Sequence, residues 1–139
     1  QRVLPGAPVN LIVLWAAWCP SCAGEMPAVQ RLLDTYAPRG LAAASIAIHL
    51  PDDGDEVDAV KRFVISKGIA FPTFLVDEPA YDRLDALCRS AGRAGLVLPT
   101  VFLTDAAGRI LSVLSGREVE TLPRVLETHL PPPPPASSP

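Results

Sequence analysis

Apolar side chains along this chain switch between continuous runs and helically spaced positions. Residues 9–16 form a continuous run, VNLIVLWA, which is rich in β-branched residues and bounded by Pro8. Such a run predicts a strand buried on both faces. From residue 23 to residue 36 apolar residues recur three and four positions apart, which predicts a helix with one buried face. Its apolar residues are Met26, Val29, Leu32, Leu33 and Tyr36.

The alternation of strand and helix then repeats. Residues 41–50 predict a second strand and residues 56–67 a second helix, and residues 73–76 and 79–91 predict a short strand and a third helix. A strand, a helix and a strand in this order form a right-handed crossover between parallel strands. We therefore expect a parallel pair at the centre of a sheet.

The C-terminal part of the chain predicts a hairpin and a last helix. Residues 100–104 and 109–114 predict two strands, and the Asp-Ala-Ala-Gly segment between them has the composition of a turn between antiparallel strands. Residues 118–130 predict the helix, with Pro123 near its start, where a missing N–H costs least. The sheet is therefore expected to be mixed.

These elements predict one α/β domain over residues 1–130, with a central mixed sheet and helices on both faces. A chain of 139 residues is in the size range of a single core. Residues 131–139 begin with five prolines, cannot bury a core, and predict an extended, disordered tail.

Charge and hydropathy argue against a nucleic-acid partner and against a membrane-spanning segment within this sequence. The net charge is −3 and the chain has no run of Lys or Arg, which argues against nucleic-acid binding. The longest apolar stretch, residues 9–19, is shorter than the roughly 20 residues that a membrane-spanning helix needs, so we expect the chain as given to be soluble. We also expect it to be a monomer. The chain begins at Gln1 rather than Met, which is compatible with a removed signal peptide or anchor.

Candidate chemistry lies where the first strand meets the first helix, in the segment Trp18-Cys19-Pro20-Ser21-Cys22. Pro20 suits the first helical position and would place Cys19 at the helix N-cap, where unpaired N–H groups and the helix dipole favour a thiolate. Because the thiolate is the nucleophile, we expect Cys19 to attack. Cys22 lies three residues later on the same helix face and would resolve the mixed disulfide.

A metal site is the competing interpretation of this cysteine pair. Zinc normally takes four ligands, and the remaining candidates, Cys88, His49 and His129, have no ligand spacing. We therefore favour redox chemistry without a metal or another cofactor. Cys88 falls at helical spacing with apolar residues and is expected to be a buried, inert thiol.

Two motifs resemble a known family. The segment LIVLWAAWCPSCAGEMP resembles the active-site stretch of the thioredoxin superfamily. More narrowly, WCPSC followed by Glu25 and Pro27 resembles the TlpA/ResA/CcmG (DsbE) branch, and LVLPTVFLTDAAGRIL resembles the second motif of that branch. The resemblance extends from about residue 6 to residue 130.

The resemblance implies a thioredoxin fold and a set of site residues. It implies a cis peptide bond at Leu98-Pro99, lying against the cysteine pair and pairing with an incoming peptide like a short strand. Trp18 and Pro20 would complete the platform for a substrate. Glu25 would exchange a proton with the resolving thiol, although a carboxylate in the first turn of a helix can also simply complement the helix dipole.

The function implied by this resemblance is the reduction of protein disulfides outside the cytoplasm, for example in the periplasm. The substrate would be a protein such as apocytochrome c, and a membrane donor would supply electrons to a tethered reductant. Two alternatives stay open: a DsbA-type oxidase that uses the same cysteines in the opposite direction, and a Cu(I) carrier. Copper carriers of the Sco type have wider cysteine spacing and an added His. The segment 79–95 is longer than expected for the family at this place, and the sequence does not indicate its role.

Overall fold

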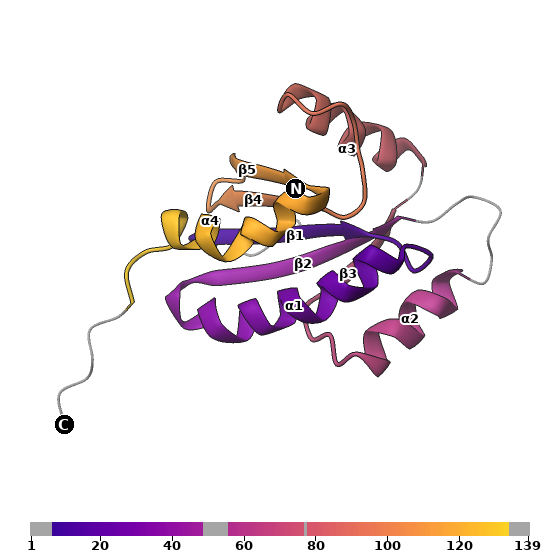
Figure 1. Cartoon of the computed structure of the whole chain (residues 1–139), viewed down its shortest axis with the longest axis horizontal. Helices are drawn as coiled ribbons and strands as arrows, with labels where there is room; N and C mark the ends of the chain where they lie inside the picture. The colour runs from indigo at the N-terminus through magenta and orange to yellow at the C-terminus, as the bar shows by residue number, and fades with distance from the viewer. Residues whose placement is uncertain (1–6, 49–55, 77, 134–139) are drawn as a thin grey trace.

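A computed structural model describes residues 7–48, 56–76 and 78–133. Five strands form one sheet in the order β3-β2-β1-β4-β5 (Figure 1). The strands β1, β2 and β3 are parallel neighbours, whereas β4 is antiparallel to both β1 and β5. Their bounds are β1 (Val9–Trp15), β2 (Leu41–Ile48), β3 (Thr73–Val76), β4 (Thr100–Asp105) and β5 (Ile110–Ser115). The predicted mixed sheet with a central parallel pair is confirmed.

Helices cover both faces of the sheet, as predicted. The main core joins one face to α1 (Pro20–Tyr36), α2 (Glu56–Ser66) and α4 (Leu122–His129). Figure 1 shows α3 (Glu78–Ser90) apart from α1 and α2, with the sheet between them. Short 3₁₀ turns, η1 (Ala37–Arg39) and η2 (Gly116–Thr121), precede β2 and α4.

The central strand β1 is buried on both faces. Alternate side chains of the strand, including Leu11 and Val13, contribute to the main core, which also contains Met26 of α1 and Leu126 of α4. A buried polar chain crosses the parallel strands: the indole N–H of Trp15 donates to Ser45 Oγ at 3.2 Å, and this hydroxyl donates to Thr73 Oγ1 at 2.8 Å. The Trp15 indole N–H and the Ser45 hydroxyl are thereby satisfied.

The segment 79–95 packs against the second face of β1, which gives it a structural role. Leu14 on that face packs with Phe102, Val113 and the fully buried Cys88 of α3. The segment therefore forms the helix that closes this face of the sheet and the connection that leads on to β4. The expectation that Cys88 is buried is confirmed.

The prediction of one continuous helix over residues 118–130 is wrong. Ser115 and Glu118 form a capping box that opens the 3₁₀ turn η2, and α4 begins only at Leu122. Pro123 has no N–H and therefore cannot donate the α-helical bond to the Val119 carbonyl. The amide of Leu122 instead bonds that carbonyl in the 3₁₀ manner.

Several expectations lie at the edges of the described chain. Residues 131–133 are exposed and have no regular structure. The rest of the expected tail, residues 134–139, and positions 49 and 50 of the second predicted strand lie outside the described residues. Among the helices that the structure describes, none has both the length and the apolar character to cross a membrane.

Candidate redox site

The cysteine pair lies at the turn from β1 into α1, at the carboxyl end of the central strand. Cys19 has extended backbone angles, φ −105° and ψ 105°, and is the N-cap of α1, with Pro20 in the first turn. Its sulfur accepts a hydrogen bond from the Cys22 amide, with Sγ and N 3.4 Å apart. The sulfur therefore takes the place of the oxygen that usually caps a helix, where amide donors stabilise negative charge.

The two thiols differ in their surroundings. Cys19 keeps 9% of its surface exposed, whereas Cys22 is fully buried. Burial, and then the hydrogen bond with Cys19, raises the pKa of Cys22 to about 12. Cys22 is consequently protonated at neutral pH, while Cys19 is the thiol that a partner can reach. This asymmetry supports the predicted division into attacking and resolving thiols.

The second motif enters the sheet beside the cysteine pair. Strand pairing places Thr100 opposite Leu14, near the end of β1, so the Leu98-Pro99 segment reaches the edge where α1 begins. The Leu98-Pro99 peptide bond is cis. The amide of Gly116 donates to the Pro99 carbonyl at 2.9 Å and holds the start of η2 against this segment.

The predicted substrate platform contains exposed and buried positions. Trp18 is 53% exposed directly before Cys19, and Pro20 is exposed after it. Leu98 is half-buried and packs against the core that contains both cysteines, and Pro99 is buried. The exposed apolar surface therefore comes from residues that flank Cys19 in the chain.

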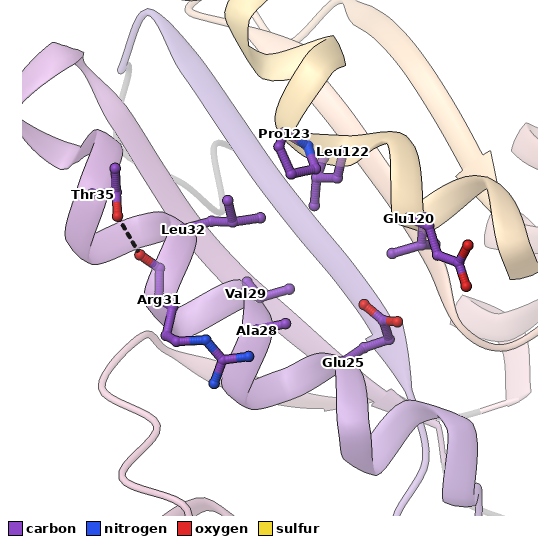
Figure 2. Close-up of a pocket in the computed structure, with 10 residues that line it drawn as sticks. Glu25, Ala28, Val29, Arg31, Leu32, Thr35, Glu120, Leu122 and Pro123 are labelled. Carbon is purple, nitrogen blue, oxygen red and sulfur yellow. Dashed lines mark hydrogen bonds between the residues drawn. The ribbon is translucent and has the colours of Figure 1, made fainter.

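Glu25 lies on the next turn of α1 after Cys22. It lines a pocket of about 400 Å³ between α1 and the segment formed by η2 and α4. Figure 2 shows its carboxylate turned toward that of Glu120 on η2. Burial, and then the negative charge of Glu120, raises the pKa of Glu25. Neither carboxylate belongs to an ion pair identified within the described ranges.

Sequence patterns did not identify Glu120. It is an exposed residue in a short 3₁₀ turn, 95 positions from Glu25 in the chain, and no local motif relates the two. Their proximity depends on how η2 packs beside α1. Only the tertiary structure brings this second carboxylate to the site.

Other candidate ligands do not join the cysteine pair. Cys88 belongs to the core on the opposite face of the sheet from Cys19 and Cys22. His129 is the last residue of α4, and His49 lies outside the described residues. In the described ranges no group of three or more His, Cys, Asp or Glu residues is placed to hold a metal ion.

Comparison with known proteins gives both a family and close relatives. The AhpC/TSA family model matches residues 4–113. The thiol-disulfide oxidoreductase ResA of Bacillus thuringiensis subsp. konkukian is 30% identical over 107 residues, which are 76% of this chain and 54% of that protein. The chain thus spans about half the length of the curated relatives it matches.

Solved structures share the fold. A thioredoxin-family thiol:disulfide interchange protein from Chlorobium tepidum TLS superposes with a TM-score of 0.69 at 24% identity, covering 87% of this chain and 79% of that one. A secreted Mycobacterium tuberculosis disulfide oxidoreductase homologous to E. coli DsbE gives 0.65 at 18% identity, covering 89% and 84%. Together with the cysteine pair at the strand-to-helix turn, these matches show that the chain has a thioredoxin fold, is similar to ResA and DsbE-type proteins, and belongs to the AhpC/TSA family.

Proposed function

We propose that this chain is a thiol–disulfide oxidoreductase that reduces disulfide bonds in proteins outside the cytoplasm. The observation that carries the proposal is the sulfur of Cys19 at the N-cap of α1, bonded by the Cys22 amide. Amide donors and the helix dipole stabilise a thiolate at that position. The names of the ResA and DsbE-type relatives support the same chemistry.

The first step of the proposed reaction uses Cys19. Its thiolate attacks one sulfur of the partner disulfide, the partner S–S bond breaks, and a bond forms between Cys19 and the attacked sulfur. The other partner sulfur leaves as a thiolate and takes a proton from solvent. Trp18, Pro20, Leu98 and Pro99 form the surface on which the partner backbone lies during this step.

The second step uses Cys22. Its thiol loses a proton and attacks Sγ of Cys19, which forms the Cys19–Cys22 disulfide and releases the second partner sulfur as a thiolate. Two electrons pass from the cysteine pair to the partner. Because the pKa of Cys22 is raised to about 12, this step needs a proton acceptor, and we assign that role to Glu25 on the next turn of α1.

The partners in the proposal follow from the family resemblance. The substrate is a protein disulfide such as that of apocytochrome c. A membrane-bound thiol donor returns the Cys19–Cys22 disulfide to the dithiol form, which completes the cycle. An N-terminal anchor would keep the domain near that donor.

The test is the equilibrium potential of the Cys19–Cys22 couple against glutathione, combined with turnover of insulin disulfides. We expect insulin reduction and a potential near the thioredoxin value of about −270 mV. A potential near the DsbA value of about −120 mV would identify an oxidase instead. Stoichiometric Cu(I) binding that survives a chelator, without dithiol exchange, would identify a copper carrier.

Cysteine variants test the assigned order of attack. Cys22→Ser should accumulate mixed disulfides through Cys19, because the resolving step is lost. Cys19→Ser should accumulate none, because its remaining site thiol is buried and protonated. Mass spectrometry of the trapped complexes distinguishes the two variants.

A further inference from the structure

Arg93 bonds the connection that leads to the Leu98-Pro99 peptide to strand β5 and to the turn η2. It follows α3 on the connection that leads to β4. Its Nη1 donates to Glu118 Oε1 of η2 at 2.6 Å, and its Nη2 donates to the Val113 carbonyl of β5 at 2.9 Å. The planar guanidinium fork allows one side chain to make both directed bonds.

Glu118 carries this contact into the start of η2. The same Oε1 accepts the Ser115 amide at 3.1 Å, and Ser115 Oγ lies 3.1 Å from Thr100 Oγ1 of β4. The hydrogen bond from Arg93, and then that from the Ser115 amide, lowers the pKa of Glu118. The carboxylate is therefore charged over the neutral range, and the contact with Arg93 persists there.

The connection is held at a second point closer to Leu98. Asp85 Oδ1 of α3 accepts the Leu96 amide at 2.7 Å. Gly95 has φ +151°, and a Cβ at this position would lie 2.9 Å from the same Asp85 oxygen. The path from Arg93 to Leu98 is therefore constrained from α3 on one side and from β5 and η2 on the other.

We propose that Arg93 is a positioning residue, which sets the spacing between the Leu98-Pro99 segment and the Ser115-Gly116 segment and so prepares the surface that a partner polypeptide occupies. The inference rests on the proposed function. Arg93 acts through backbone placement: Gly116 already donates to the Pro99 carbonyl, and Arg93 anchors the segments on both sides of this bond. No sulfur, proton or electron passes through Arg93.

Stability alone is a poor reason for this contact. The side chains of Arg93 and Glu118 are 34% and 44% exposed, and ion pairs this exposed contribute little to folding. Their loss would nevertheless release the connection from η2. Arg93 should therefore influence how proteins dock more than how firmly the domain folds.

The experiment compares a protein disulfide with a small disulfide. Steady-state kinetics are measured on Arg93→Ala with insulin and with hydroxyethyl disulfide, and a dithiol reductant in the assay returns the Cys19–Cys22 disulfide to the dithiol form after each turnover. Hydroxyethyl disulfide has no peptide backbone to lie on the docking surface. We expect KM for insulin to rise about tenfold, as the loss of a charge-assisted contact permits. The insulin kcat, the Cys19–Cys22 potential and the rate with hydroxyethyl disulfide should stay within about twofold of the unmodified chain. Arg93→Lys should give an intermediate KM, because an ammonium keeps the charge but not the fork.

Arg39→Ala is the matched control. Arg39 also bridges a carboxylate and a backbone carbonyl, those of Glu127 and Pro131, but it follows the C-terminal end of α1. Its removal should leave KM for insulin unchanged. If Arg93→Ala does not fold, Glu118→Gln weakens the same contact with a side chain of equal size.

Two results would overturn the role of Arg93 and leave the proposed function standing. One is an unchanged KM for insulin in the Arg93 and Glu118 variants. The other is a parallel loss of activity on both substrates that follows the loss of stability of these variants. Failure of the unmodified chain to reduce insulin, while it still reduces hydroxyethyl disulfide, would instead overturn the proposed function and this inference with it.

Discussion

At the scale of single residues, the two site cysteines differ because one caps a helix and the other enters the core. The sulfur of Cys19 receives an amide N–H, and the residue keeps 9% of its surface exposed, whereas Cys22 is fully buried. Both features follow from a three-residue spacing across a helix start. The chemistry of the pair thus depends on where the helix begins.

We expect iodoacetamide to alkylate Cys19 selectively in the reduced, native protein at about pH 8, where a free thiol is partly ionised. Cys22 should resist because its pKa is raised to about 12, and Cys88 because it is buried in the second core. Peptide mapping by mass spectrometry gives the labelled positions, and denatured protein, with all three thiols labelled, is the control. Equal native labelling of Cys19 and Cys22 would contradict the assigned roles.

The proximity of Glu25 and Glu120 predicts how the pKa of Glu25 and the pH profile of thiol–disulfide exchange respond to a substitution. Glu120→Gln removes a negative charge at constant size, so the raised pKa of Glu25 should fall toward its ordinary value. NMR titration of the Glu25 carboxyl carbon measures this, and the pH profile of exchange should shift in the same direction if Glu25 accepts the Cys22 proton. Glu78→Gln in the first turn of α3, on the other face of the sheet, is the control.

The Glu25–Glu120 pair also predicts the direction in which the free energy of unfolding changes with pH. A raised carboxyl pKa means that the folded state binds the proton more tightly than the unfolded state. The free energy of unfolding is therefore highest, as far as Glu25 is concerned, when the pH is below the pKa of this carboxyl in the unfolded chain. It falls as the pH rises through the raised pKa of Glu25 in the folded protein. At neutral pH, Glu120→Gln should therefore raise the free energy of unfolding, by less than about 1 kcal/mol since solvent screens the pair. A decrease at neutral pH would contradict the repulsion.

At the scale of elements, the turn between η1 and β2 needs glycine. Gly40 has φ +101°, and a Cβ there would lie 2.8 Å from Pro8 Cγ. Side chains disfavour this left-handed backbone, and the neighbouring proline ring cannot move aside as a flexible side chain would. The start of β2 therefore depends on a residue without a Cβ.

Gly40→Ala should lower the free energy of unfolding by about 1–3 kcal/mol, from backbone strain and the contact with Pro8. Urea denaturation measures the loss. Gly24→Ala is the matched control, because a Cβ at Gly24 in α1 would meet nothing within 4 Å. Its higher helix propensity should stabilise the protein by about 0.5–1 kcal/mol. Equal effects of the two substitutions would contradict this account.

At the scale of the whole molecule, two cores of unequal size hold the sheet. Leu126 of α4 is fully buried in the main core, which also contains Trp15 and both site cysteines. Leu84 of α3 is only half-buried against the second core. The site therefore shares its packing with the larger core.

Leu126→Ala should lower the free energy of unfolding by about 2–5 kcal/mol, since it leaves a cavity in the main core. Leu84→Ala, at a half-buried position, should lower it by less. Urea denaturation followed by tryptophan fluorescence measures both, because the buried Trp15 becomes exposed on unfolding. A larger loss for Leu84→Ala would mean that α3 contributes more to the fold than its burial indicates.

The sequence by itself determined what depends on near neighbours in the chain. Apolar period and turn composition predicted all five strands, and Pro20 after Cys19 predicted the helix start that makes Cys19 an N-cap. The error in the last helix, which begins at Leu122, arose because a capping box and a proline compete within a few residues. Local rules are reliable where one signal acts alone.

Only the tertiary structure decided which distant groups meet. Glu120 lies in Glu25's pocket because η2 packs beside α1. Arg93 bonds Glu118 across 25 positions of the chain. The segment 79–95 contains α3, which covers the second face of the sheet. Caps and periods are set by hydrogen bonds within one or two turns. Contacts between elements depend instead on how buried faces pack against one another, and no pattern along the chain encodes that geometry directly.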